Sequence, residues 1–149
     1  MYVYLMQHGE ALSEEHAPGR PLSLTGIEQV KAVALSAYRA EIRIPVIYHS
    51  GRLRARRSAE LLSDEVGGEV VAREGLEPKD DVEPVAEWLQ NQSEDLALVG
   101  HLPFLDRLAG RLVNGDPGKS VVNFRFGVLV RLIRTDSGWK VDWIARPSP

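Results

Sequence analysis

The sequence predicts an α/β fold, a three-layer α/β/α sandwich around a mostly parallel central sheet. Short, continuously apolar runs alternate along the chain with segments of helical periodicity, which is typical of a parallel sheet covered on both faces. The last third changes pattern. There "FGVLVRLIR", the turn "TDSG" and the alternating run "WKVDWI" predict a C-terminal antiparallel hairpin.

The apolar runs at 2–6, 46–48 and 96–99 are expected to be buried strands, and "EVVA" at 69–72 is a weaker fourth. Four helices lie between or after them, with apolar residues at helical spacing: Ile27, Val30, Ala34 and Ala37; Ala55, Ala59, Leu62 and Val66; Val82, Val85, Ala86 and Leu89; Leu105, Leu108, Ala109 and Leu112.

Local signals indicate where these helices begin and end. Thr25 with Glu28 reads as a capping box for the first helix. Gly67 and the glycine after it end the second. Asp81 is the expected cap of the third, and Pro103 opens the fourth at a position where its missing N–H does no harm.

Length and composition narrow the class of protein. At 149 residues we expect one domain spanning 1–149. The net charge of −3 argues against a nucleic-acid partner, and no apolar run approaches the roughly 18 residues of a membrane span. Cysteine is absent, which excludes disulfides, thiol nucleophiles and Cys-based zinc sites. The N-terminus lacks the basic segment of a signal peptide, so a cytoplasmic protein is expected.

Histidines follow three of the predicted strands. His8 ends the first strand, His49 the second, and His101 follows the run at 96–99. Four arginines lie just beyond the second strand, between 52 and 57. Because ligands of open α/β sheets bind beyond the carboxyl ends of the strands, these side chains predict one shared site.

The residue types favour the handling of an anion. Leu102 precedes a helix whose free N–H groups and positive dipole end attract phosphate, and an arginine can grip the same oxyanion. A neutral His8 could attack phosphorus, while Gly9 would let the backbone approach a ligand closely. Three histidines could instead hold zinc, but the nearby arginines would repel a cation. His49 reads either as a pocket wall or as a residue facing a helix, and His16 as a structural loop residue.

Five segments, in order, resemble the histidine phosphatase superfamily, which is phosphoglycerate mutase-like in fold. They are "YLMQHGEA", "RPLSLTGIEQ", "IYHSGRLRARRSAELL", "LEPKDDVEPVAEWL" and "LVGHLPFL". The chain is most similar to the small SixA-type branch, the protein-phosphohistidine phosphatases. The family's Arg-His-Gly motif reads Gln7-His8-Gly9 here, and its Ser-Pro dipeptide reads Ser50-Gly51.

The resemblance implies roles for individual residues. His8 would be the nucleophile, Arg54 would bind the phosphoryl oxygens, and His101 would stabilise the charge of the transferring group. Backbone N–H groups near Leu102 would help. Gln7 supplies a hydrogen bond but no charge, so the phosphate pocket has one cation fewer than the family pattern.

The resemblance also implies a function. We expect a phosphatase of signal transduction that hydrolyses phosphohistidine on a protein through a covalent phosphohistidine intermediate, releases inorganic phosphate, and needs neither metal nor cofactor. Glu77 and Glu10 are the candidate proton donors, although an imidazole leaving group makes a donor less necessary. Two alternatives remain open: a phosphatase of small phosphoesters, and a phosphate-binding module impaired in catalysis by Gln7.

Overall fold

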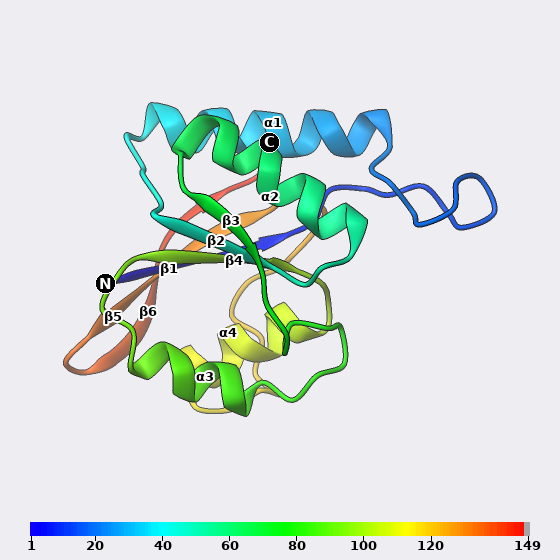
Figure 1. Cartoon of the computed structure of the whole chain (residues 1–149). Helices are drawn as coiled ribbons and strands as arrows, with labels where there is room; N and C mark the ends of the chain where they lie inside the picture. Colours follow the sequence, from blue (N-terminus) through cyan, green and yellow to red (C-terminus); the bar gives the residue numbers. More distant parts are fainter. Residues whose placement is uncertain (148–149) are drawn as a thin grey trace.

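A computed structural model of the chain describes residues 1–147 (Figure 1). Strands and helices alternate as predicted until the C-terminal hairpin. Their order is β1 (Tyr2–Gln7), α1 (Leu24–Arg39), β2 (Val46–His49), α2 (Leu53–Val66), β3 (Glu69–Ala72), α3 (Glu83–Gln90), β4 (Leu96–Gly100), α4 (Phe104–Asn114), β5 (Leu129–Thr135) and β6 (Gly138–Ala145).

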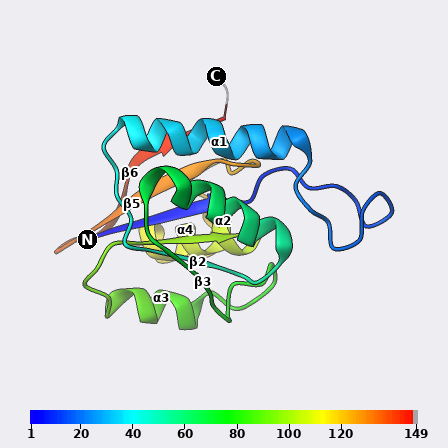
Figure 2. The same cartoon turned by 45° about the horizontal axis from the view of Figure 1, so that its top comes forward.

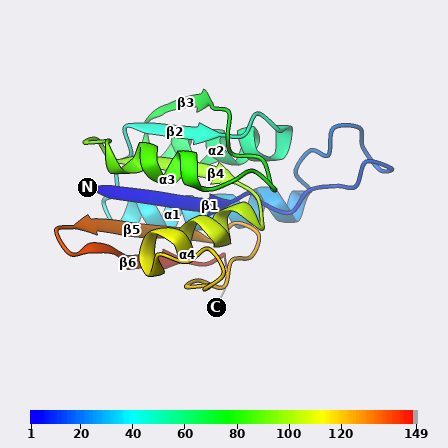
Figure 3. The same ribbon diagram turned by 90° about the horizontal axis from the view of Figure 1, so that it is seen from below.

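The strands form one six-stranded sheet in the order β3-β2-β4-β1-β5-β6. The first four strands in this order pair in parallel, whereas β5 pairs antiparallel with both β1 and β6. Helices α1 and α2 cover one face and α3 and α4 the other (Figures 1 and 3). The predicted α/β/α sandwich with a C-terminal hairpin is therefore confirmed.

Strand β1 shows why the apolar runs are continuous. Val3 and Leu5 point into the core beneath α3 and α4, whereas Tyr4 and Met6 point into the core beneath α1 and α2. Both faces of the strand are buried, so residues 2–6 form a continuous apolar run, and the polar Gln7 ends the strand.

The start of α1 corrects one sequence-based interpretation. The capping residue is Ser23, whose Oγ accepts a hydrogen bond from the Gly26 N–H at 3.0 Å. Thr25 lies inside the first turn, so the Thr25–Glu28 capping box is wrong. Helix α3 follows Val82, although the Asp81 carboxylate does accept from the Glu83 N–H at 3.0 Å.

The carboxyl ends of β2, β4 and β1 lie side by side because these strands are neighbours in the sheet. Each extends one residue beyond its predicted run, so His8 and His101 directly follow β1 and β4, and His49 is the last residue of β2. The loop between β1 and α1 projects beyond this edge (Figure 2). Within residues 1–147, no helix is long and apolar enough to cross a membrane.

Candidate active site

Two imidazoles that are 93 positions apart in the chain meet at the carboxyl edge of β1 and β4. The ring centroids of His8 and His101 are 5.0 Å apart, with the planes tilted by 58°. The β1–β4 pairing produces this contact, since the His8 N–H donates to the Gly100 carbonyl at 3.1 Å. Both side chains are almost fully buried.

A backbone contact fixes the tautomer of His8. Its Nδ1 lies 2.7 Å from the Gly9 carbonyl oxygen, which can only accept, so Nδ1 carries the proton. Burial, with a smaller contribution from the Arg54 charge, lowers the pKa of His8 from its ordinary 6.5 to about 4. At neutral pH the ring is uncharged, with a lone pair on Nε2.

Ser50 fixes the other ring. Its Oγ lies 2.6 Å from Nε2 of His101 and also accepts a weak hydrogen bond from the Arg52 N–H at 3.4 Å. Burial, together with His8 and the nearby arginines, lowers the pKa of His101 to about 3. This ring is also neutral, which leaves one proton for its two nitrogens.

The arginines after β2 have different positions. Arg54 is only 8 % exposed, and burial lowers its pKa, as do the charges of Arg20 and Arg52. Arg52 lies at the surface and pairs with Glu77 at 2.6 Å. Arg57 is exposed on the outer side of α2. Arg54 is therefore the arginine of this segment that is buried beside the imidazoles.

Orphaned polar atoms gather at this edge. Within the described part of the chain, four buried side-chain atoms have no hydrogen-bond partner: Gln7 Oε1, Arg54 Nε, His101 Nδ1 and Trp139 Nε1. The first three belong to the predicted site. Buried polar groups are nearly always satisfied, so an unpartnered set of this kind indicates a site for a polar ligand. Rotating the Gln7 amide would replace its orphaned acceptor with N–H donors.

The structure gives another reason for Gly9 than the close approach of a ligand. A Cβ at this position would lie 2.6 Å from the Gly26 carbonyl oxygen and 3.0 Å from a methyl of Val30. The Gly9 N–H donates to Ser58 Oγ at 3.0 Å. Packing against α1 therefore requires the glycine, and its N–H is already bound within the protein.

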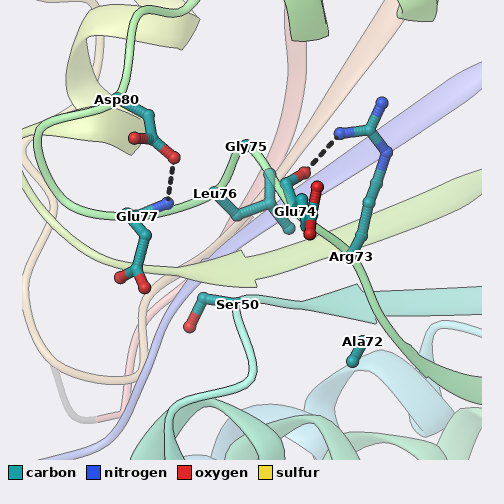
Figure 4. Close-up of a pocket in the computed structure, with 8 residues that line it drawn as sticks. All are labelled: Ser50, Ala72, Arg73, Glu74, Gly75, Leu76, Glu77 and Asp80. Atoms are coloured by element: carbon teal, nitrogen blue, oxygen red, sulfur yellow. Dashed lines mark hydrogen bonds between the residues drawn. The ribbon is translucent and has the colours of Figure 1, made fainter.

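The candidate proton donors lie on different sides. One carboxylate oxygen of Glu10 accepts from Ser23 Oγ at 2.9 Å, which ties it to the start of α1. Glu77 lies with Ser50 on the wall of a cavity of about 370 Å³ (Figure 4). Its carboxylate pairs with Arg52 at 2.6 Å. Of the two candidate donors, Glu77 is therefore the one that shares a cavity wall with Ser50, the residue hydrogen-bonded to His101.

The remaining histidines lie apart from this pair. The His49 Nδ1 accepts from the Gly51 N–H at 3.0 Å, and its pKa is lowered by burial and then by Arg56. Side chains alternate along β2, and Ile47 packs in the core beneath α1 and α2, so His49 faces the same helices. His16 bonds to Ser13 in the exposed loop after β1. Among the described residues, no group of three His, Cys, Asp or Glu side chains could hold a metal ion.

Sequence reasoning missed two residues at the site. The charge of Arg20 lowers the pKa of both His8 and His101, so the loop after β1 brings a further cation close to the imidazoles. Arg20 is the first residue of the segment "RPLSLTGIEQ", and this position was the sequence signal that could have indicated its role. Phe126 packs its ring 5.7 Å from that of His8, and nothing in its local sequence indicates this contact.

A mostly parallel sheet thus carries paired imidazoles and a buried arginine at its carboxyl edge, a set of groups that favours an oxyanion ligand. The model of the histidine phosphatase superfamily (branch 1) matches residues 3–80, just over half of the chain. The chain therefore belongs to this superfamily. An uncharacterized protein of Picosynechococcus sp. is 29 % identical over 87 % of this chain and 83 % of its own length.

Solved structures share the fold. The protein histidine phosphatase SixA complexed with tungstate matches with a TM-score of 0.86 and 23 % identity, over 99 % of this chain and 97 % of that one. The phosphoserine phosphatase of Entamoeba histolytica in complex with 3-phosphoglyceric acid matches with a TM-score of 0.72 and 17 % identity, over 96 % and 95 %. At these identities the likeness shows a shared fold.

Gln7→Arg tests whether position 7 lines the oxyanion site. Gln7 is buried at the end of β1, beside the chain's two site imidazoles. Because a hydrogen bond to a charged group contributes about 1.5–3 kcal/mol, the added guanidinium is expected to tighten tungstate or vanadate binding roughly 10- to 100-fold. Calorimetry measures the Kd. Gln90→Arg adds the same charge at the far end of α3 and serves as control. Unchanged affinity in Gln7→Arg would place residue 7 outside the site.

The lowered pKa values predict neutral rings in mild acid. At pH 5.5 an imidazole of ordinary pKa 6.5 is about nine-tenths protonated, whereas His8, with its pKa of about 4, stays neutral, and so does His101. Lowering the pH through 4 protonates Nε2 of His8 and removes its lone pair, so kcat/KM falls only there. Ring ¹⁵N shifts at pH 5.5 measure this. Imidazolium shifts for His8 at that pH would contradict it.

Proposed function

We propose that this protein hydrolyses phosphohistidine on other proteins through a phosphoryl group held on His8. The observation that carries the proposal is the set of unpartnered, buried Arg54 Nε and His101 Nδ1 beside an imidazole whose Nε2 is left as the nucleophile. An oxyanion is the ligand that this combination of donors and nucleophile suits best.

In the first step, the lone pair of His8 Nε2 attacks phosphorus. The N–P bond of the substrate breaks, and its electron pair stays on the leaving imidazole, which is protonated from solvent. Arg54 neutralises the phosphoryl oxygens during transfer. Ser50 directs its hydroxyl proton to Nε2 of His101, so that the ring's own proton lies on the orphaned Nδ1 and can donate to the same oxygens.

In the second step, water attacks the phosphoryl group on His8. The bond between Nε2 and phosphorus breaks, the water loses a proton to solvent, and inorganic phosphate leaves. The Gly9 carbonyl keeps the proton of His8 on Nδ1 in both steps, so the ring regains its starting tautomer. No metal enters either step.

The leaving group favours phosphohistidine over a phosphoester. An imidazole leaves without a built-in acid, whereas an alkoxide needs one, an effect of typically 10²–10⁴-fold. Of the two candidate carboxylates, Glu10 is bound to Ser23 and Glu77 is paired with Arg52. The fold shared with the SixA structure that holds tungstate supports the same choice. The removal of phosphoryl groups from protein histidines is a step of signal transduction, and we propose that role for this protein.

A direct comparison of substrates tests the proposal. The purified protein is mixed with a phosphohistidine-bearing protein, free phosphohistidine and a panel of sugar phosphates, and phosphate release is followed with time. We expect kcat/KM to be highest on the phosphoprotein. No release from any substrate, with tungstate still bound, would instead identify an impaired binding module.

A phosphatase of small phosphoesters is the second candidate. The cavity beside Ser50 favours it, because Glu77 on its wall could protonate a leaving alkoxide. The shared fold with a phosphoserine phosphatase agrees with this reading. Higher kcat/KM on sugar phosphates, lost in Glu77→Gln, would establish it in place of the first.

A further inference from the structure

A second cavity lies on the β5 side of the site and has a basic lining. Its volume is about 510 Å³. The residues that line it are Gln29, Asn123, Arg125, Phe126, Val128, Arg146 and Pro147. Two are arginines and none is acidic. We call it the Arg125–Arg146 pocket.

Backbone contacts hold this pocket in a fixed position relative to the nucleophile. The Gly127 N–H donates to the carbonyls of Gln7 and His8, at 3.0 and 3.2 Å. Arg146 Nη1 donates to the Asn123 carbonyl at 2.9 Å, which joins the segment after β6 to the loop before β5. The pocket therefore cannot shift without moving the end of β1.

Phe126 belongs both to the pocket and to the surroundings of His8. Its ring lines the pocket and also packs 5.7 Å from the ring of His8. An extended peptide advances about 3.3 Å per residue, so a side chain one to three residues from a phosphohistidine lies about 3–10 Å along the peptide from it, a range that includes the 5.7 Å between the rings of His8 and Phe126. The pocket is thus placed to receive a neighbour of the phosphorylated residue.

The positive charge of the pocket favours a negatively charged side chain in that neighbouring position. Within residues 1–147, neither Arg125 nor Arg146 takes part in an ion pair. A guanidinium presents paired donors that match the two oxygens of a carboxylate. The cavity on the other side of the site has an acidic excess, since three carboxylates and one arginine line it: Glu74, Glu77, Asp80 and Arg73 (Figure 4).

We propose that the Arg125–Arg146 pocket binds a carboxylate side chain close in sequence to the phosphohistidine, so that the protein selects acidic substrate segments. The inference rests on the proposed function for its phosphorylated substrate. The recognition of the carboxylate itself depends only on the pocket.

The experiment uses two peptides of identical sequence, with Glu or with Gln at the positions flanking a central histidine. Phosphorylated peptides give kcat/KM, and unphosphorylated, fluorescently labelled ones give Kd. The parent, the double variant Arg125→Gln/Arg146→Gln and the control Lys140→Gln are compared. Lys140 is exposed on β6, near the hairpin at the opposite end of the sheet.

The parent is expected to prefer the Glu peptide by about five- to tenfold in kcat/KM and in Kd, as for a partly exposed charge-assisted contact. The preference should fall to about onefold in the double variant and persist in Lys140→Gln. Equal behaviour of the two peptides in the parent, or a preference that survives in the double variant, would overturn the proposal.

A last comparison separates this inference from the proposed function. If no phosphorylated substrate is hydrolysed, the Kd values still decide whether the pocket recognises carboxylates. If the double variant loses turnover of small phosphorylated carboxylic acids while the peptides bind equally, the pocket serves a metabolite and the assignment to peptides is wrong.

Discussion

Replacing His8 by asparagine is expected to abolish phosphate release, with a loss on the order of 10⁴-fold or more, as for removal of a nucleophile in other hydrolases. The loss is expected because the Gly9 carbonyl keeps the proton on Nδ1 and leaves Nε2 as the unprotonated nitrogen that attacks. Asparagine keeps a polar side chain of similar reach but has no nitrogen lone pair to attack phosphorus. The measurement is the rate of phosphate release from a phosphohistidine protein.

The matched control is His16→Asn, which changes a histidine in the exposed loop after β1. Parent activity is expected there. Reactions quenched in alkaline denaturant, where a phosphohistidine survives, should trap a labelled phosphoryl group on the parent and none on His8→Asn. An active His8→Asn protein, or label on another residue, would refute the covalent mechanism.

Replacing Arg54 by glutamine is expected to lower kcat/KM by roughly 10²–10³, the usual effect of losing one preorganised charge donor. Arg54 is buried beside both imidazoles, and its Nε has no hydrogen-bond partner among the described residues. Tungstate affinity should fall with the rate, since a ground-state oxyanion uses the same donors. Both are measured against Arg57→Gln, an exposed change on the same helix.

Stability separates a functional from a structural role for Arg54. A buried cation without an acidic partner costs desolvation energy in the folded protein. Arg54→Gln should therefore unfold at the same temperature as the parent or above it, because functional residues often lower stability. A lower Tm together with the lower rate would indicate that Arg54 serves the fold.

The local pattern of the sequence predicted most of the fold. Short continuous apolar runs such as 2–6 are typical of strands buried on both faces, and Gly67 ends α2 where expected. The cap of α1 was harder, because Ser23 and Thr25 both suit the position. In the structure the capping residue, Ser23, also contacts Glu10, which lies 13 residues earlier in the chain. A local sequence pattern cannot show such a contact.

The candidate site divides in the same way. The residues at strand ends were found because chain order and the rule of parallel sheets bring them to one edge. Arg20 and Phe126 were missed because loops bring them there, and loop paths depend on long-range contacts. Gly9 was identified from the sequence, but the reason for it was not. That reason is the close contact with Gly26, which belongs to another element, α1.

By itself, the sequence determined the α/β class, the order of its elements and the imidazoles and arginines available for chemistry, because periodicity and composition are local properties. Only the tertiary structure decided which ring nitrogen of His8 is free, which arginine is buried, and that the cavities on either side of the site carry opposite charge. These properties depend on desolvation and on contacts between distant segments, which exist only once the chain has folded.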